Sequence, residues 1–500
     1  MNDGATHSIY RGSMRGAKVG LSLCTLLFAL VSGCTVGPDY VRPSAEAPVT
    51  YKEQNGWKSA TPSDHVLRGN WWTLFNDAQL DALEAKVTVS NQNLIAAEAQ
   101  FREARALLQI ARSGYFPTAT VGAAASRYRG SQNLPTSTRG NVGPGTDLVL
   151  PFDVSWEVDL WGRVRRTVES SQAAAQASAA DVETVRLSLQ AELATDYLEL
   201  RGLDAQSKLL DATIVAYQQA LDLTTQLFKG GAASEADVVQ AQAQLKSTQA
   251  QAIDIGVQRA QLEHAIAVLT GQPPANLSIP PSPLTATPPP VPVGMPSELL
   301  ERRPDVAGAE RRVAAANAQI GVAQAAFYPS LVLSATGGLE ASSLASWFSF
   351  PSRYWALGPS VSETLFDGGL RTGQSAQARA AYDGVVASYR QTVLTGFQEV
   401  EDNLAALRIL EQEAAVQNDA VKAAQRSVAL TTDQYKVGIV SYLNVVTAQT
   451  FALADERSAV DIATRRMTSS VLLVKALGGG WNASQLPSNT DLVSKSSTQK

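Results

Sequence analysis

Few residues in this chain could do chemistry on a substrate. The complete set of histidines and cysteines is His7, His65, His264, Cys24 and Cys34. None of the spacings typical of zinc sites, phosphate-binding loops or serine hydrolases occurs in the sequence. We therefore expect no catalytic residue, no metal and no cofactor apart from a covalent lipid, and the chain is not expected to be an enzyme.

The carboxylates with the clearest pattern are Asp153, Glu157 and Asp159, which alternate with apolar residues. A period of two is typical of a strand with two different faces. They are poor candidates for a catalytic pair, because nothing else in the chain supports a pocket. We expect them to line the water-filled lumen of a membrane barrel, with Trp156 and Trp161 toward lipid or its interface.

Four segments with strand periodicity must supply this barrel. Alternation is clear in 147–160 and 330–340, and weaker near 117–128 and 354–366. Each segment is long enough to cross a membrane as a tilted strand. A sheet in lipid must close on itself, which takes about eight strands or more, so copies of the chain must share the barrel. A soluble sandwich is the alternative, and the lack of strands for a second sheet weakens it.

The charge balance argues against nucleic acid as a partner. The 500 residues contain 41 basic and 46 acidic side chains, a net charge of −5. Without residues 1–33 the counts become 38 and 45, a net charge of −7. Proteins that bind nucleic acid usually present a basic stripe instead.

The N-terminus has the features of an export signal. Basic residues precede an apolar run over residues 19–31, which is too short to span a membrane and is followed by Ser-Gly-Cys34. We interpret residues 1–33 as a lipoprotein signal peptide and Cys34 as the site of lipid attachment, which begins a lipidated segment, 34–74. An ordinary signal peptide that ends near a cysteine is the alternative. Thr35 replaces the aspartate that retains such lipoproteins in the inner membrane.

Proline placement divides the remainder of the chain. No proline occurs in 152–272 or in 360–486, whereas ten of the 23 prolines fall in 273–296. The proline-free spans are rich in Ala, Gln, Leu and Glu, which predicts very long helices. The proline-rich segment predicts a semi-rigid, extended linker.

The first proline-free span predicts one helix from about Arg163 to Lys229, roughly 100 Å long at 1.5 Å per residue. Its apolar residues recur with a period near 3.5, which is typical of coiled-coil packing. They are Val182, Val185, Leu189, Leu193, Leu200, Leu203, Leu210, Ile214, Tyr217, Leu221 and Phe228. A break or kink near Gly202 is the alternative.

The two halves repeat one plan. The first-half residues Gly231, Ser234 and Asp237 match Gly438, Ser441 and Asn444, each 207 residues later. In each half the glycine is expected to end a long helix in a left-handed conformation, and the serine to cap the next helix. We therefore predict two repeats, 75–272 and 297–479, and a C-terminal tail, 480–500.

Motifs over nearly the whole mature chain resemble the bacterial outer-membrane efflux protein family, the TolC-like ducts, in their NodT-type lipoprotein branch. The first half contributes Cys34-Thr-Val-Gly-Pro-Asp-Tyr40, Trp71-Trp72-x-x-Phe75, Trp156-Glu-Val-Asp-Leu-Trp-Gly162 and Gly231-Ala-Ala-Ser-Glu-Ala-Asp237. The second half contributes Glu301-Arg-Arg-Pro-Asp305, Phe327-Tyr-Pro-Ser330, Leu365-Phe-Asp-Gly-Gly369, Phe397-Gln-Glu-Val-Glu401 and Tyr435-Lys-Val-Gly438.

The resemblance implies a mainly α fold with a membrane β-barrel. Three copies would each supply duplicated helical hairpins to a periplasmic tunnel and four strands to a 12-stranded barrel in the outer membrane. It further implies a passive exit for small molecules that works with a periplasmic adaptor and an inner-membrane RND-type pump. A duct for type I protein secretion and a non-conducting periplasmic coiled-coil lipoprotein remain as alternatives.

The resemblance also implies a gate at the periplasmic hairpin tips. In such ducts the second tip often carries aspartates, whereas this chain has Asn444 and Thr447 there. That difference puts an acidic ring from the second repeat in doubt. Tyr435 matches a family tyrosine that holds neighbouring hairpins together. Asp237 could bond to Tyr435 as a latch, or it could simply cap its own helix.

Overall fold

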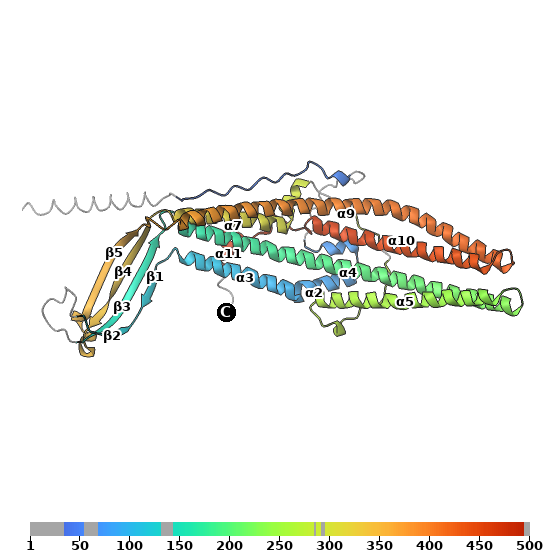
Figure 1. Ribbon diagram of the computed structural model, residues 1–500, viewed down its shortest axis with the longest axis horizontal. Coiled ribbons are helices and arrows are strands. Elements are labelled where there is room, and N and C mark those ends of the chain that lie inside the picture. The colour runs from blue at the N-terminus through green and yellow to red at the C-terminus, as the bar shows by residue number, and fades with distance from the viewer. Residues whose placement is uncertain (1–34, 55–68, 132–143, 285–286, 292–295, 495–500) are drawn as a thin grey trace, which may run out of the picture.

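The computed structural model describes residues 35–54, 69–131, 144–284, 287–291 and 296–494. The molecule is elongated, with a small sheet at one end and two helical hairpin tips at the other (Figure 1). Cys34 and the signal segment before it lie outside the described residues. The predicted lipid attachment therefore stays a prediction.

Duplicated hairpins form most of the length. Helices α4 (Arg163–Lys229) and α9 (Leu370–Lys436) have 67 residues each, and α5 (Glu235–Leu269) and α10 (Tyr442–Ala476) have 35 each. The predicted bounds of the first long helix are confirmed. Among the described residues, no helix is both long enough and apolar enough to cross a lipid bilayer.

Gly202 does not break α4, and a contact between the two hairpins explains why a glycine stands there. A Cβ atom added to Gly202 would lie 2.3 Å from Thr464 Oγ1 on α10. The residue therefore permits close helix packing rather than a kink.

Shorter helices surround the hairpins near the sheet. Helices α3 (Gln92–Ser113) and α7 (Pro304–Ala325) again have equal lengths, 22 residues, and α7 packs against both α4 and α9. The other α-helices of the described residues are α2 (Ala78–Ser90), α6 (Leu299–Arg302), α11 (Asn489–Ser494) and α8 (Leu344–Trp347), the last of which lies in the connection between β4 and β5. Short 3-10 turns lie at η1 (Lys52–Gln54), η2 (Trp71–Phe75), η3 (Pro274–Asn276), η4 (Pro296–Glu298), η5 (Phe350–Ser352) and η6 (Ala483–Gln485).

The sheet is antiparallel and draws on both halves of the chain. Its strands are β1 (Thr118–Val121), β2 (Ala124–Tyr128), β3 (Gly145–Val158), β4 (Ser330–Ala341) and β5 (Arg353–Ser362). Both β1 and β2 pair with β3, which is followed by β4 and β5. The sheet therefore has four strand positions, as predicted.

The segment predicted near 117–128 is divided into two strands. Opposite the division stands Pro151, which has no N–H to donate to the ladder. Its carbonyl accepts a hydrogen bond of 3.0 Å from Gly122 N. The pairing with β3 resumes at Ala124.

The sheet does not close within one chain. In the described part of the chain, β1 and β2 pair on one side only, and so does β5. The backbone N–H and C=O groups along two outer edges therefore have no strand partner.

The largest core lies where the short helices pack against the long helices of the two hairpins, away from the hairpin tips. It contains Trp71, Tyr197 and Tyr389, each with about 1% of its surface exposed. The N-terminal segment runs along this region as an extended strap (Figure 1). Its Asp39 forms an ion pair of 3.0 Å with the buried Arg166 of α4.

Candidate functional site

The polar face of the sheet carries two of the three predicted lumen carboxylates. Asp153 pairs in register with Thr336 of β4, whose hydroxyl donates to Asp153 Oδ1 at 2.6 Å. Glu157 lies on the same face and accepts a bond of 2.8 Å from Arg163 Nε. Both carboxylates have partners, as expected for acidic groups near a polar lumen. Their place in a lumen stays a prediction.

Asp159 does not share this face, because β3 ends at Val158. Its carboxylate instead accepts the backbone N–H groups of Val164 and Arg165, both at 2.9 Å. These N–H groups belong to the first turn of α4 and have no partner inside the helix. The prediction that Asp159 stands on the strand is therefore wrong: the residue caps the helix where strand and helix meet.

The second half repeats this cap. Asp367 accepts a backbone bond of 3.2 Å from Arg371 N at the start of α9. Arg165 and Arg371, which are 206 residues apart, also bind these aspartates through their side chains. The junction of sheet and helix is thus built twice from the same residue types.

Aromatic residues gather at this junction. Trp156 lies on the apolar face of β3 and donates to Tyr115 O at 3.2 Å. Trp161 lies beyond the strand, donates to Pro329 O at 2.8 Å and stacks on Tyr328 with ring centroids 4.8 Å apart. Aromatic side chains with a polar edge suit the boundary between lipid and water.

The first hairpin tip has the predicted geometry. Gly231 has a φ of 78°, in the left-handed region that favours glycine. Ser234 Oγ accepts from Asp237 N at 3.2 Å, while Asp237 Oδ2 accepts from Ser234 N at 3.0 Å. This reciprocal pair is a capping box and fixes the start of α5.

The second tip repeats the turn without the side-chain cap. Gly438 has a φ of 77°, but the Ser441 side chain makes no capping bond. Asn444 N donates to the backbone oxygen of Ser441 at 3.1 Å, and Thr447 Oγ1 donates to Leu443 O at 2.8 Å. Ser441 is therefore the N-cap residue of α10, as predicted, but its hydroxyl takes no part in the cap. Asn444 lacks the carboxylate that accepts from the serine N–H in the first tip.

Tyr435 is buried but does not bond to Asp237. Its ring packs against Tyr442, with centroids 5.2 Å apart, in a buried cluster that includes Ala241 of the other hairpin. Its hydroxyl has no hydrogen-bond partner within the described residues. Burial raises the pKa of Tyr435, the neighbouring Thr224 side chain opposes this shift, and the Asp237 carboxylate adds to it. The carboxylate is already engaged in the capping box, so the structure favours the capping role of Asp237 over a latch.

Contacts between the two hairpins could not be read from the sequence. Tyr217 of α4 donates its hydroxyl to Gln449 O of α10 at 3.2 Å. Further along, Arg457 donates to Gln251 Oε1 at 3.0 Å. Tyr217 was predicted only as part of an apolar seam. A tyrosine in such a seam is a usable signal, since its hydroxyl needs a partner when buried.

Two carboxylates on the helices have strongly raised pKa values. Burial raises the pKa of Glu84 to about 9, with Asp81 contributing, and neither Glu84 side-chain oxygen has a hydrogen-bond partner in the described part of the chain. Burial also raises the pKa of Asp196 to about 6, with Glu192 and Glu199 contributing. A carboxyl group that burial keeps protonated makes the stability of the fold depend on pH.

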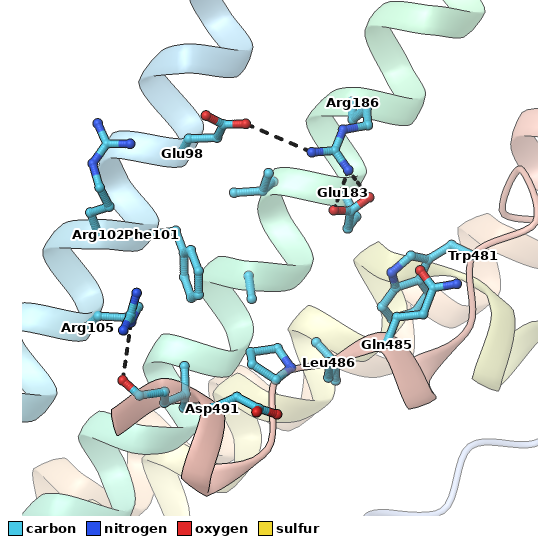
Figure 2. Close-up of a pocket in the computed structure, with 14 residues that line it drawn as sticks. Glu98, Phe101, Arg102, Arg105, Glu183, Arg186, Trp481, Gln485, Leu486 and Asp491 are labelled. Atoms are coloured by element: carbon cyan, nitrogen blue, oxygen red, sulfur yellow. Dashed lines mark hydrogen bonds and ion pairs between the residues drawn. The ribbon is translucent and has the colours of Figure 1, made fainter. Parts of the chain in front are cut away.

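A cleft of about 410 Å³ lies between α3, α4 and the C-terminal segment (Figure 2). Its walls include Phe101, Arg102 and Trp481, and Arg186 lies 4.0 Å from Glu98 across it. Arg105 donates to Leu492 O at 3.2 Å and so holds the C-terminal helix in place. The described lining includes no Cys, His or Ser, and part of the wall is the C-terminal segment itself, with Leu486, Pro487 and Leu492.

Comparison with known proteins supports the same function as the geometry. The sequence profile described as outer membrane efflux protein matches residues 84–272 and 295–479, which correspond to the two duplicated halves. The chain belongs to the outer membrane efflux protein family. The fold class predicted from the sequence, and the prediction of an outer-membrane efflux channel, are confirmed.

Relatives of this outer membrane efflux protein cover almost its whole length. The probable efflux pump outer membrane protein SepC of Pseudomonas putida is 32% identical over 470 residues, which is 92% of this chain and 97% of that protein. The outer membrane protein OprJ of Pseudomonas aeruginosa is 30% identical over 476 residues, 94% of this chain and 97% of its own.

Solved structures agree with the fold. The outer-membrane channel OprN superposes with a TM-score of 0.84 at 32% identity, covering 90% of this chain and 100% of that chain. The Campylobacter jejuni CmeC outer membrane channel gives a TM-score of 0.84 at 25% identity, covering 90% and 96%. The long helices and small sheet are therefore those of an outer-membrane efflux channel.

Proposed function

We propose that three copies of this chain form a passive duct through the outer membrane, which carries small molecules out of the cell. The duct would work with a periplasmic adaptor and an inner-membrane RND-type pump that supplies the energy. No cofactor, nucleic acid or catalytic step is part of the proposal. The observation that carries it is the open sheet, with unpaired edges on β1, β2 and β5.

An open sheet cannot remain in lipid, because each unpaired N–H or C=O costs several kcal/mol there. Four strand positions are also too few to close a barrel, which takes about eight. Three copies supply twelve, an even number within the range of outer-membrane barrels. The edge strand β5 of one copy would then pair with β1 and β2 of the next.

The proposed lipid anchor fits the position of the N-terminal strap. Val36 N donates to Trp161 O at 3.0 Å, and Thr35 packs so closely on Gly162 that an added Cβ there would lie 2.4 Å from Thr35 Cγ2. The chain therefore enters the described structure where the sheet meets the helices. Acyl chains on Cys34 would start at the membrane surface and could insert without a spacer.

The hairpin tips are the proposed periplasmic gate, since they lie at the opposite end of the molecule from the sheet (Figure 1). Because Asn444 and Thr447 are uncharged, the proposed gate includes no acidic ring at these positions of the second repeat. Relatives are named for antibiotic and toluene efflux. We propose drugs and toxic compounds as the cargo class of this chain too.

Cysteine cross-linking across the proposed subunit boundary tests this assembly. Thr120 and Ala356 stand in one row of the sheet but at its opposite edges. Three strand spacings, roughly 14 Å, separate them within a chain, which is too far for a disulfide. Cysteine at 120 would be combined in turn with cysteine at 354, 356, 358 and 360, and each single-cysteine variant would serve as its control.

Oxidation of membranes that contain the matching pair is expected to give a covalent three-chain species. The single-cysteine controls should give none. If all four combinations remain uncross-linked while the protein stays in the outer membrane, the shared barrel is wrong.

A further inference from the structure

The strands separate positive from negative charge by face. We propose that Arg127 and Arg353, which lie on opposite edge strands of one sheet and would face each other across the boundary between two copies, form a site on the lipid-facing side of the barrel for the phosphate groups of outer-leaflet glycolipid. The proposal rests on the proposed function, because it takes the apolar face of the sheet as the lipid-facing one.

The register places both arginines on the apolar face. Arg353 of β5 stands opposite Leu339, which stands opposite Leu150. Arg127 of β2 stands opposite Thr146, which shares the face of Leu150 because both have even positions on β3. The two arginines therefore share the face of the sheet whose side chains would touch lipid.

Every carboxylate on the described strands is on the other face. The four are Asp147, Asp153, Glu157 and Glu340. The β3 carboxylates have odd positions, and Glu340 stands opposite Val149. Closing the barrel with further copies would repeat the same faces, so no strand of a sister chain could bring an acidic side chain to these arginines. A negative partner for them must come from outside the barrel.

Both arginines lie at the end of the sheet away from the helices. β2 and β4 end there, and β3 and β5 begin there (Figure 1). With the helices in the periplasm, this end reaches the outer leaflet. The described connecting residues at this end, 129–131, 144 and 342–352, contain one further arginine, Arg129, and no Asp or Glu. The local charge is therefore positive where lipid phosphates would lie.

Exposed aromatic side chains lie near Arg353, as is typical of the boundary between lipid and water. The Arg353 guanidinium lies over the Phe350 ring, with Cζ 4.2 Å from the centroid. Phe350 is 74% exposed and Trp355 is 76% exposed. In the described part of the chain, neither Arg127 nor Arg353 forms an ion pair. A guanidinium that is positioned on a ring and lacks a carboxylate can bind phosphate through two parallel N–H bonds.

The test measures glycolipid that stays bound to the full-length assembly in mild detergent. The probe is lipid A with both phosphates, compared with the same lipid after dephosphorylation, and native mass spectrometry counts bound molecules. The variants are Arg127→Gln/Arg353→Gln, the charge-conserving Arg127→Lys/Arg353→Lys, and Arg426→Gln on exposed α9 as a matched control. An added arm with inorganic phosphate separates lipid recognition from binding of the free anion.

The double glutamine variant is expected to retain at least five-fold less lipid A than the parent. The lysine variant should fall between them and the Arg426→Gln control should match the parent. Removing the phosphates should reduce retention by the parent to a similar degree, and inorganic phosphate should not displace the lipid. Equal retention by parent and double glutamine variant, equal binding of the dephosphorylated lipid, or displacement by inorganic phosphate would overturn the proposal.

Conductance in planar bilayers is recorded for the same preparations. A parent that binds lipid A through the two arginines but never conducts would contradict the proposed duct and leave the lipid site standing. If the double variant does not assemble, the single variant Arg353→Gln carries the lipid measurement.

Discussion

The hydroxyl of Tyr217 donates to the backbone oxygen of Gln449 at 3.2 Å, which joins the first hairpin to the second inside one chain. The bond is buried, and burial raises the pKa of Tyr217, so its hydroxyl remains a donor at neutral pH. It lies between the core and the hairpin tips. A bond at this position can hold the tips together without any charged group.

Tyr217→Phe removes this donor and keeps the ring. We expect the free energy of unfolding to fall by about 1 kcal/mol, the usual net value of such a bond. We also expect a higher basal conductance in planar bilayers. Tyr382→Phe is the matched control, because the Tyr382 hydroxyl has no hydrogen bond in the described part of the chain. An unchanged basal conductance for Tyr217→Phe would show that this bond does not help to keep the gate closed.

The two tips offer a paired test of capping. Ser234→Ala removes a cap and should destabilise the start of α5 by about 1 kcal/mol. Ser441→Ala should have little effect, because that side chain makes no capping bond. Hydrogen exchange of the first-turn amides measures both. Equal loss of protection in the two variants would show that the tips do not differ in this way.

Asp237→Ala separates the cap from the latch. The structure favours a cap, so α5 should exchange faster while basal conductance remains that of the parent. A clear rise in basal conductance would mean that Asp237 also restrains the gate.

The buried Glu84 should make stability depend on pH. Its folded-state pKa of about 9 lies above the ordinary value of 4.5, so the folded state holds the proton more tightly than the unfolded state. The free energy of unfolding should therefore fall as the pH rises from 4.5 toward 9, by up to about 1.4 kcal/mol per pH unit from this group. Glu84→Gln should flatten the curve, whereas Glu103→Gln on exposed α3 should not. If Glu84→Gln showed the same pH dependence as the parent and as the Glu103→Gln control, the raised pKa of Glu84 would be contradicted.

Gly202 and Gly256 test close helix packing. Gly202→Ala puts a Cβ 2.3 Å from Thr464 Oγ1 and should destabilise the fold, while Thr464→Ala should partly restore stability in the double variant. Gly256 has nothing within 4 Å of an added Cβ, so Gly256→Ala should stabilise α5 by about 0.5–1 kcal/mol. Thermal unfolding compares the four proteins. If Gly256→Ala lowered stability as much as Gly202→Ala, the effect at Gly202 could not be attributed to its contact with Thr464.

Much of the fold could be predicted because it follows from local rules. The absence of proline and the 3.5-residue seam predicted a single helix from about Arg163 to Lys229, which matches α4, and the left-handed glycines at 231 and 438 marked both turns. The alternation in β3 and β4 predicted two faces, which the register confirms.

What could not be predicted depends on a partner distant in sequence or on a single residue position. The division between β1 and β2 depends on Pro151 in the neighbouring strand, and the glycine at 202 depends on Thr464. Asp159 is a helix cap rather than a strand residue because β3 ends at Val158, two residues before the alternation ends. Periodicity describes faces well, but it does not say where a strand ends.

The most direct test of the account measures the mass and the conductance of the same purified sample. Light scattering in mild detergent gives the number of chains in the particle, and planar bilayers show whether that particle conducts. We expect conducting particles with the mass of three chains, because the unpaired edges of one sheet must be completed by sister copies. Conducting particles with the mass of one chain would contradict the account.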